Sequence, residues 1–274
     1  MYQKPTVPRS IGGVLDDAFQ LYKASFTSCW LPMLIIAVIA VASGFYRFSA
    51  VPAVAPGAGL RELLLQFQTT PRGYQAVSLL VMVVNLVFYS VLFLNVVAVS
   101  HGDTPSFGTS LSTALRRAPA LIVSAIIFFV AIVVGFILLL VPGFYLLNRL
   151  QLFMVPLVTE SQGPVQSLGA SWNLVGGHWW RTATLVFVMI AIIYVLDLAL
   201  VALAGAIVAV AGGGAATLVR GAGAFVLGSM VLSAIVGIFT TPLLVSVFVT
   251  VYQDLVLRKG GGDLEARLGA LPQG

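Results

Sequence analysis

Three stretches of the chain share one layout, in which a short amphipathic segment runs directly into a strongly apolar one. They are residues 10–19, 106–115 and 163–172, and they align without gaps. The alignment gives three shared positions, a leucine, a small residue and a large apolar residue: Leu15, Leu111 and Leu168; Ala18, Ala114 and Ser171; Phe19, Leu115 and Trp172. Internal repetition constrains architecture before any local detail. It predicts an all-α integral membrane protein with six transmembrane helices in three repeated units, each a cytoplasmic interfacial amphipathic helix plus a helical hairpin.

Composition supports a membrane protein and excludes a soluble globular enzyme. Of the 274 residues, 59% are hydrophobic and 8% are charged, whereas soluble domains carry about 25% charged residues. Several apolar runs exceed the roughly 18 residues that mark a spanning helix, and their continuity excludes an outer-membrane barrel, whose strands alternate. The net charge of +5 contains no basic cluster longer than two residues. This pattern indicates juxtamembrane orientation signals and no nucleic-acid partner.

The expected spans form a single membrane domain, residues 1–274, with repeat units of about 10–100, 106–160 and 163–257 and a polar tail at 258–274. We expect spans at residues 30–48, 75–100, 119–141, 144–158, 180–211 and 224–257. Pro142-Gly143 predicts a tight turn between the third and fourth spans. The fourth span is short and contains Asn148, Arg149 and Gln151. If it is re-entrant, the chain has five spans and its termini lie on opposite sides.

Six spans place both termini on one side of the membrane, and the basic residues predict which side. That side carries nine of them: Lys4, Arg9, Lys23, Arg116, Arg117, Arg181, Arg258, Lys259 and Arg267. The other side carries four: Arg47, Arg61, Arg72 and Arg220. Because cytoplasmic loops are enriched in lysine and arginine, both termini are predicted to be cytoplasmic.

Polar residues inside the expected spans are the first candidates for a site, because charge in the hydrocarbon layer is costly. Arg149 and Asp197 are each expected roughly 5–10 Å below the outer surface, which predicts a bidentate ion pair. The pair either only joins two spans, or Arg149 contacts an anionic lipid phosphate in a cavity. Asn85 and Asn95 are expected to bridge helices.

Near the cytoplasmic boundary, two acidic residues and the amphipathic segments supply further candidates. Glu160 and Asp254 each either stay hydrated or meet Arg181 or Arg258. Candidate interfacial contacts are Arg116, Arg117, Trp172 and Arg181. The amphipathic segments either seal the rim of the bundle or frame a mouth where a lipid headgroup or a partner docks.

Catalytic motifs are not found in the sequence. There is no phosphate-binding loop ending in GK[ST], no HExxH, no GxSxG and no pair of CxxC motifs. His101 and His178 are each isolated at predicted membrane edges, so a two-histidine metal site is not expected. We therefore expect no catalytic, cofactor-binding or metal-binding residues, and a protein that is not an enzyme.

Several segments together resemble known membrane families: residues 13–23, 141–146, 156–160, 163–175 and 251–255. They are similar to the membrane domain of bacterial glycerophosphodiester phosphodiesterases and to the YciC-type uncharacterised inner-membrane family. The resemblance covers nearly the whole chain and implies a multi-pass protein of the bacterial inner membrane. In the fused enzymes the chemistry belongs to a separate soluble barrel domain, so the resemblance implies no catalytic residue here.

Two functions are consistent with these observations. The first is a non-catalytic membrane subunit, scaffold or anchor for a partner in lipid or envelope metabolism. The alternative is a transporter or binding protein for a lipid or other amphiphile, which uses a cavity between the repeats. The expected partners are the lipid bilayer, including anionic phospholipid, and either a protein partner or a second copy of the chain.

Overall fold

The computed structural model describes residues 2–50, 59, 61–62, 65, 70–211 and 222–269. Within these ranges the chain is helical and contains no strand. The main helices are α1 (Ile11–Ala50), α3 (Arg72–Ser100), α4 (Phe107–Leu138), α5 (Leu140–Leu150), η1 (Gln151–Phe153), α6 (Met154–Thr159), α7 (Pro164–Val175), α8 (Trp179–Ala211) and α10 (Ala222–Gly269).

Among the residues that the structure describes, six helical segments are long and apolar enough to cross a membrane, in agreement with the expected number of spans. They are Ile11–Ala50, Arg72–Ser100, Phe107–Leu138, Leu140–Thr159, Trp179–Leu203 and Leu227–Gly260. The fourth combines α5, η1 and α6. The chain is therefore a multi-pass helical membrane protein by length and composition.

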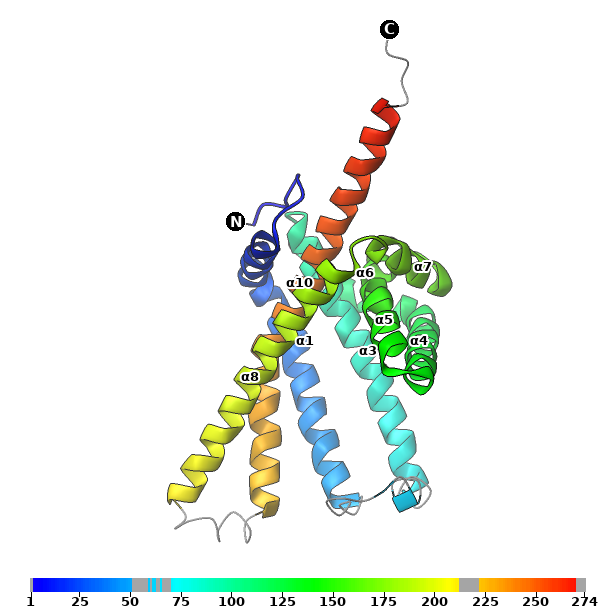
Figure 1. Cartoon of the computed structure of the whole chain (residues 1–274). Helices are drawn as coiled ribbons and strands as arrows, with labels where there is room; N and C mark the ends of the chain where they lie inside the picture. Colours follow the sequence, from blue (N-terminus) through cyan, green and yellow to red (C-terminus); the bar gives the residue numbers. More distant parts are fainter. Residues whose placement is uncertain are drawn as a thin grey trace.

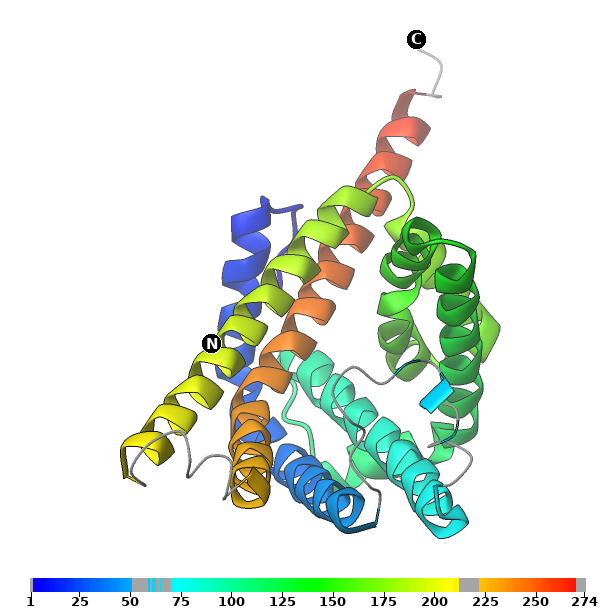
Figure 2. The same cartoon turned by 60° about the horizontal axis from the view of Figure 1, so that its bottom comes forward.

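The helices separate into two groups, which Figure 1 and Figure 2 show from two directions. Helices α1, α3, α8 and α10 run lengthwise in the first view and diverge toward one end. The α4–α5 hairpin and α7 gather beside α3, and the hairpin turns well short of the level at which α1 and α8 end and α3 begins. We call the end at which α1 begins and α3 ends the proximal end, and the opposite one the distal end.

Two of the expected amphipathic helices are not separate from the spans that follow them. Residues 11–23 continue into the first span as part of α1, and residues 107–117 continue into the third as part of α4. Only the third segment forms its own helix, α7, ahead of α8. Helix α10 continues into the expected polar tail, as far as Gly269.

A buried polar chain joins α1, α3 and α4 near the proximal end. Pro32 lies inside α1 and has no N–H, so the carbonyl of Ser28, four residues earlier, loses its usual helical donor. The Nδ2 of Asn95 donates to that carbonyl at 2.8 Å, and the Oδ1 of Asn95 accepts from Ser110 Oγ at 2.6 Å. Asn95 is buried and bridges three helices, which confirms the expectation for this residue. Asn95 therefore supplies the Ser28 carbonyl with a hydrogen-bond donor, which the acyl chains of lipids cannot provide.

The α4–α5 hairpin turns at a different residue from the one expected. Leu139 is extended between the two helices, whereas Pro142 and Gly143 lie in the first turns of α5. A proline near the start of a helix removes no intrahelical bond. Gly143 is needed for packing: a Cβ there would lie 2.5 Å from a ring carbon of Phe136. The turn is tight because the two helices touch, not because Pro142-Gly143 forms it.

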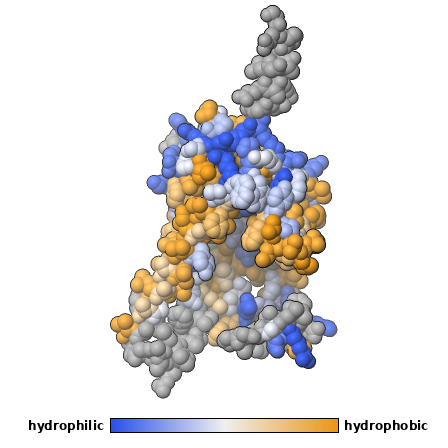
Figure 3. Space-filling view, viewed as in Figure 1, coloured by the Kyte–Doolittle hydropathy of each residue, from blue (hydrophilic) through white to orange (hydrophobic). Residues whose placement is uncertain are grey.

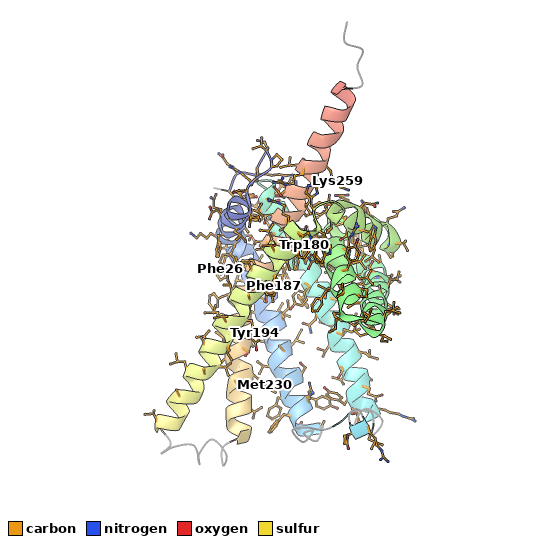
Figure 4. All side chains as sticks on the ribbon, viewed as in Figure 1. Phe26, Trp180, Phe187, Tyr194, Met230 and Lys259 are labelled. Carbon is orange, nitrogen blue, oxygen red and sulfur yellow. The ribbon has the colours of Figure 1, made fainter. Side chains whose placement is uncertain are left out.

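The molecular surface separates into polar and apolar zones. In Figure 3 hydrophilic residues gather at the proximal end and apolar residues cover the zone below it. Trp180, Phe187 and Tyr194 follow one another at seven-residue intervals along α8, with exposed fractions of 79%, 72% and 67%. Figure 4 shows these three along α8. Such a stripe suits a helix face that contacts lipid or another helix.

Candidate functional site

The most connected polar group at the proximal end is the carboxylate of Asp254, which is 5% exposed. Its Oδ2 accepts from Arg181 Nε at 3.0 Å and from Arg258 Nε at 2.9 Å. Its Oδ1 accepts from the backbone N–H of Arg9 at 2.9 Å. The sequence left two alternatives for Asp254, a hydrated carboxylate or an ion pair with Arg181 or Arg258. The structure shows ion pairs with both arginines. A buried carboxylate needs such partners, because desolvation penalises an unpaired charge.

The same arginines fasten the N-terminal segment to α8 and α10. Arg181 and Arg258 each donate through Nη2 to the carbonyl of Arg9 at 2.6 Å. The Arg9 side chain lies 3.6 Å from Asp17 Oδ2 on α1. The cavity beside this cluster has a volume of about 10 Å³, room for a single water. The arrangement is therefore a structural tie between four segments, with no space for a ligand.

The N-terminal segment is held at two further points. Tyr2 packs against the buried hydrophobic cluster that includes Leu92 and Val96. Burial raises the pKa of its phenol to about 12. The Asp17 carboxylate also raises this pKa, whereas Arg9 lowers it. The Nζ of Lys4 lies 3.0 Å from Nε2 of His101, at the end of α3. The Nδ1 of His101 faces the Val97 carbonyl at 2.9 Å. Nδ1 must carry the hydrogen there, so Nε2 is the acceptor for Lys4.

Arg149 does not pair with Asp197, and the expected ion pair is wrong. Arg149 donates through Nη1 to the Trp172 carbonyl at 2.6 Å and through Nε and Nη2 to Tyr145 Oη at 3.0 and 2.7 Å. Its guanidinium also lies 4.4 Å from the centre of the Trp172 ring, a cation–π contact. Among the ion pairs within the described ranges, none includes Arg149 or Asp197.

The depths of the two residues explain the error. Asn148, next to Arg149, donates to the carbonyl of Trp179 at the start of α8. Asp197 lies 18 residues further along α8, about 27 Å away at 1.5 Å per residue. The expectation placed Arg149 near the outer end of a full span, whereas α5 starts from a hairpin that turns early and meets α7.

The other candidate interfacial residues are mostly engaged within the protein. Arg117 donates through Nη1 to the carbonyl of Leu157 at 2.7 Å and also to Ser161 Oγ. Trp172 holds Arg149, and Arg181 holds Asp254. Arg116 is exposed. Three of the four candidate interfacial residues thus join elements of the fold, and Arg116 faces outward.

A large apolar cavity lies between α1, α3 and α4, with a volume of about 800 Å³. Its walls come from both helix groups: Ile36 and Ala40 on α1; Leu79, Met82, Val83, Asn85, Leu86 and Tyr89 on α3; Ile122, Ala125, Ile126, Phe128 and Phe129 on α4. The Oδ1 of Asn85 is buried and has no hydrogen-bond partner. The volume falls within the range of about 300–1,000 Å³ that is usual for small-molecule sites.

A second cavity, of about 330 Å³, lies at the proximal end between α3, α6 and α10. Its polar lining comes from Lys4, His101, Thr159, Glu160, Tyr252 and Gln253. Tyr252 donates through its hydroxyl to Glu160 Oε1, and the Nε2 of Gln253 donates to Ser100 Oγ at 2.9 Å. The Oε1 of Gln253 is buried without a partner. Sequence reasoning missed this site because Lys4 and Gln253 are almost the whole chain apart.

Metal chemistry finds no support in the described part of the chain. No group of three or more histidine, cysteine, aspartate or glutamate side chains there could hold a metal ion. The features that remain are a polar proximal end fastened by buried ion pairs and an apolar cavity between the helix groups.

These features define a multi-pass helical membrane protein with an open apolar cavity between α1, α3 and α4. The chain belongs to the family DUF7847, described as a domain of unknown function, whose family model matches residues 18–253. No curated protein and no solved structure matches the chain.

Proposed function

We propose that this protein binds a lipid or other amphiphile in the apolar cavity between α1, α3 and α4. The observation that carries the proposal is the cavity itself, about 800 Å³ with an almost wholly apolar lining contributed by three helices that are apolar enough to span a membrane. An acyl chain is the occupant that this apolar lining favours, because burying apolar surface against apolar surface is stabilising. Acyl chains would also surround these helices in a membrane.

Asn85 supplies the one amide in this lining. Its unpartnered Oδ1 can accept a hydrogen bond, and an unpaired polar group is costly in an apolar medium. A ligand that carries a hydroxyl or an amide N–H along with its acyl chain would satisfy it. The proposal is therefore for an amphiphile with a donor near its apolar part, bound by a non-catalytic protein.

Filling the cavity tests the proposal. Ala125 lines the cavity on α4, whereas Val130 on the same helix is 53% exposed and does not line it. Ala125→Trp should lower the amount of lipid that co-purifies with the full chain, measured by native mass spectrometry after mild extraction. Val130→Trp, the matched control, should retain the wild-type amount. Equal retention in both variants would contradict binding in this cavity.

A membrane subunit, scaffold or anchor for a partner is the second proposed function. The exposed stripe of Trp180, Phe187 and Tyr194 on α8 supports it, since aromatic residues are enriched in the cores of protein interfaces. The resemblance to the membrane domain of bacterial glycerophosphodiester phosphodiesterases and to the YciC-type family points the same way. A stoichiometric second polypeptide in the same mass spectra would favour this function.

The three-unit arrangement and the orientation also belong to the proposal. Ala18, Ala114 and Ser171, which share one position of the repeat, are all 0% exposed, and this equivalence supports three related units. We place the protein in the bacterial inner membrane with the proximal end in the cytoplasm, because the basic residues concentrate there. Cysteine labelling from either side of the membrane would test this orientation.

A further inference from the structure

The polar cavity at the proximal end differs from the apolar cavity in location and chemistry. Along α3 it begins at Val97, eight residues beyond Tyr89 of the apolar cavity, about 12 Å along the helix. Leu92, Phe93 and Val96 are buried between these levels. It lies at the proximal end, where Figure 3 shows that hydrophilic residues gather above the apolar zone. This is the level at which a phospholipid headgroup would lie beside a membrane protein.

The cavity carries both signs of charge and an unused acceptor. Lys4 provides an ammonium group, which donates one of its three N–H groups to His101 and leaves two for a ligand. Glu160 provides a carboxylate, which accepts from Tyr252 and, at 2.8 Å, from Gln162 Nε2. Gln253 is 8% exposed, and its amide oxygen has no partner. A ligand that matches this lining needs a negative group for Lys4 and several N–H donors for Glu160 and Gln253.

Other ligand types match the lining less well. A simple anion meets the Glu160 carboxylate, and a simple cation meets the Lys4 ammonium, so each gains one attraction and one repulsion. A quaternary ammonium group has no N–H and leaves the Gln253 oxygen unpaired. A primary ammonium joined to a phosphate supplies three donors and an anion a few bonds apart. The lining also contains four valines, which suit the carbon atoms between and beside the ammonium and phosphate groups of such a ligand: Val97, Val155, Val249 and Val256.

We propose that this cavity binds the zwitterionic headgroup of an amino-phospholipid of the phosphoethanolamine type. Glu160 and the Gln253 amide oxygen accept from the ligand ammonium, and Lys4 faces its phosphate. The site is separate from the apolar cavity, so it does not depend on the function proposed above. It adds a headgroup preference at the membrane surface.

The test is a competition among phosphatidylethanolamine, phosphatidylcholine and phosphatidylglycerol with identical acyl chains. The full chain is titrated with each lipid in detergent, and bound lipid is counted by native mass spectrometry. Phosphatidylethanolamine should bind about tenfold more tightly than the other two, the effect of one hydrogen bond to a charged group. Glycerophosphoethanolamine, which has no acyl chains, should compete for the same site.

Two variants and their controls assign the preference to this cavity. Glu160→Gln keeps an acceptor for Tyr252 but removes the charge, and it should abolish the preference; Asp103→Asn, at an exposed position, should keep it. Lys4→Met should weaken phosphatidylethanolamine and phosphatidylcholine alike, whereas Lys23→Met, also at an exposed position, should weaken neither.

Three results would overturn the inference: equal binding of all three lipids, a preference for phosphatidylethanolamine that Glu160→Gln leaves intact, or mass spectra in which no lipid is bound to the protein. Ala125→Trp separates this inference from the proposed function. If Ala125→Trp abolishes the headgroup preference and Glu160→Gln does not, the headgroup is recognised from the apolar cavity. The inference then fails while amphiphile binding stands.

Discussion

Replacing Asn95 by leucine tests how the fold compensates for Pro32. The change keeps the side-chain volume similar but removes the donor to the Ser28 carbonyl and the acceptor for Ser110. Interhelical hydrogen bonds in membrane proteins contribute about 0.6 kcal/mol on average and up to about 1.7. A buried carbonyl left unpaired costs about 1–3 kcal/mol. We therefore expect Asn95→Leu to lower the free energy of unfolding by about 2 kcal/mol.

The backbone origin of this effect gives the prediction a second arm. Pro32→Ala restores an N–H that can donate to the Ser28 carbonyl within α1, so Asn95 becomes less important. In the Pro32→Ala background, Asn95→Leu should cost about 1 kcal/mol less than in the wild type, a coupling typical of residues with a shared partner. Asn85→Leu, on the same helix, is the control and should change stability little, because the Oδ1 of Asn85 has no partner to lose.

The assay is reversible unfolding of the full chain in mixed micelles, followed by circular dichroism. The reasoning would be refuted if Asn95→Leu and Asn85→Leu destabilised the protein equally. It would also be refuted if the cost of Asn95→Leu were the same with proline or alanine at position 32.

Three further changes can be measured in the same assay. Asp254→Asn should lower the free energy of unfolding by about 3 kcal/mol, because it leaves arginines without their buried partner, whereas exposed Asp16→Asn should have little effect; equal effects would contradict the tie. Arg149→Lys should lower the free energy of unfolding by about 1–2 kcal/mol, because the stacking and the forked hydrogen bonds of the guanidinium are lost. Asp197→Asn should leave it almost unchanged, and a large decrease in this variant would support an ion pair between Arg149 and Asp197. Gly143→Ala should destabilise the hairpin by about 1–3 kcal/mol through overpacking, and an unchanged midpoint would argue against the close contact with the phenyl ring.

The parts of the structure that could be predicted from sequence are those with a local signal. Apolar runs of spanning length predicted six helical segments, and the described part of the chain contains six that are long and apolar enough. The expectation that Asn95 bridges helices rested on residue type and position, and the structure confirms it. The same expectation for Asn85 is not met at its Oδ1, which has no hydrogen-bond partner. For Asp254 the sequence left two alternatives open, and the structure shows the one with Arg181 and Arg258.

The remaining features depend on how the helices are arranged in three dimensions. The pairing of Arg149 with Asp197 was inferred from assumed depths, and the early turn of the α4–α5 hairpin changes the depth of Arg149. The tie to Arg9 uses its backbone N–H and carbonyl, which every residue carries and no motif reveals. The apolar cavity depends on how α1, α3 and α4 are arranged relative to one another, and hydrophobic periodicity contains no information about that arrangement.

The central claim is that an amphiphile occupies the cavity between α1, α3 and α4, and photo-crosslinking in native membranes tests it most directly. A photoreactive amino acid would replace Met82, which lines the cavity, or Val130, which is exposed elsewhere on α4. The account predicts that the probe at position 82 captures one class of amphiphile in high yield, while the probe at position 130 captures bulk phospholipids in proportion to their abundance. The same unselective mixture at both positions would contradict it.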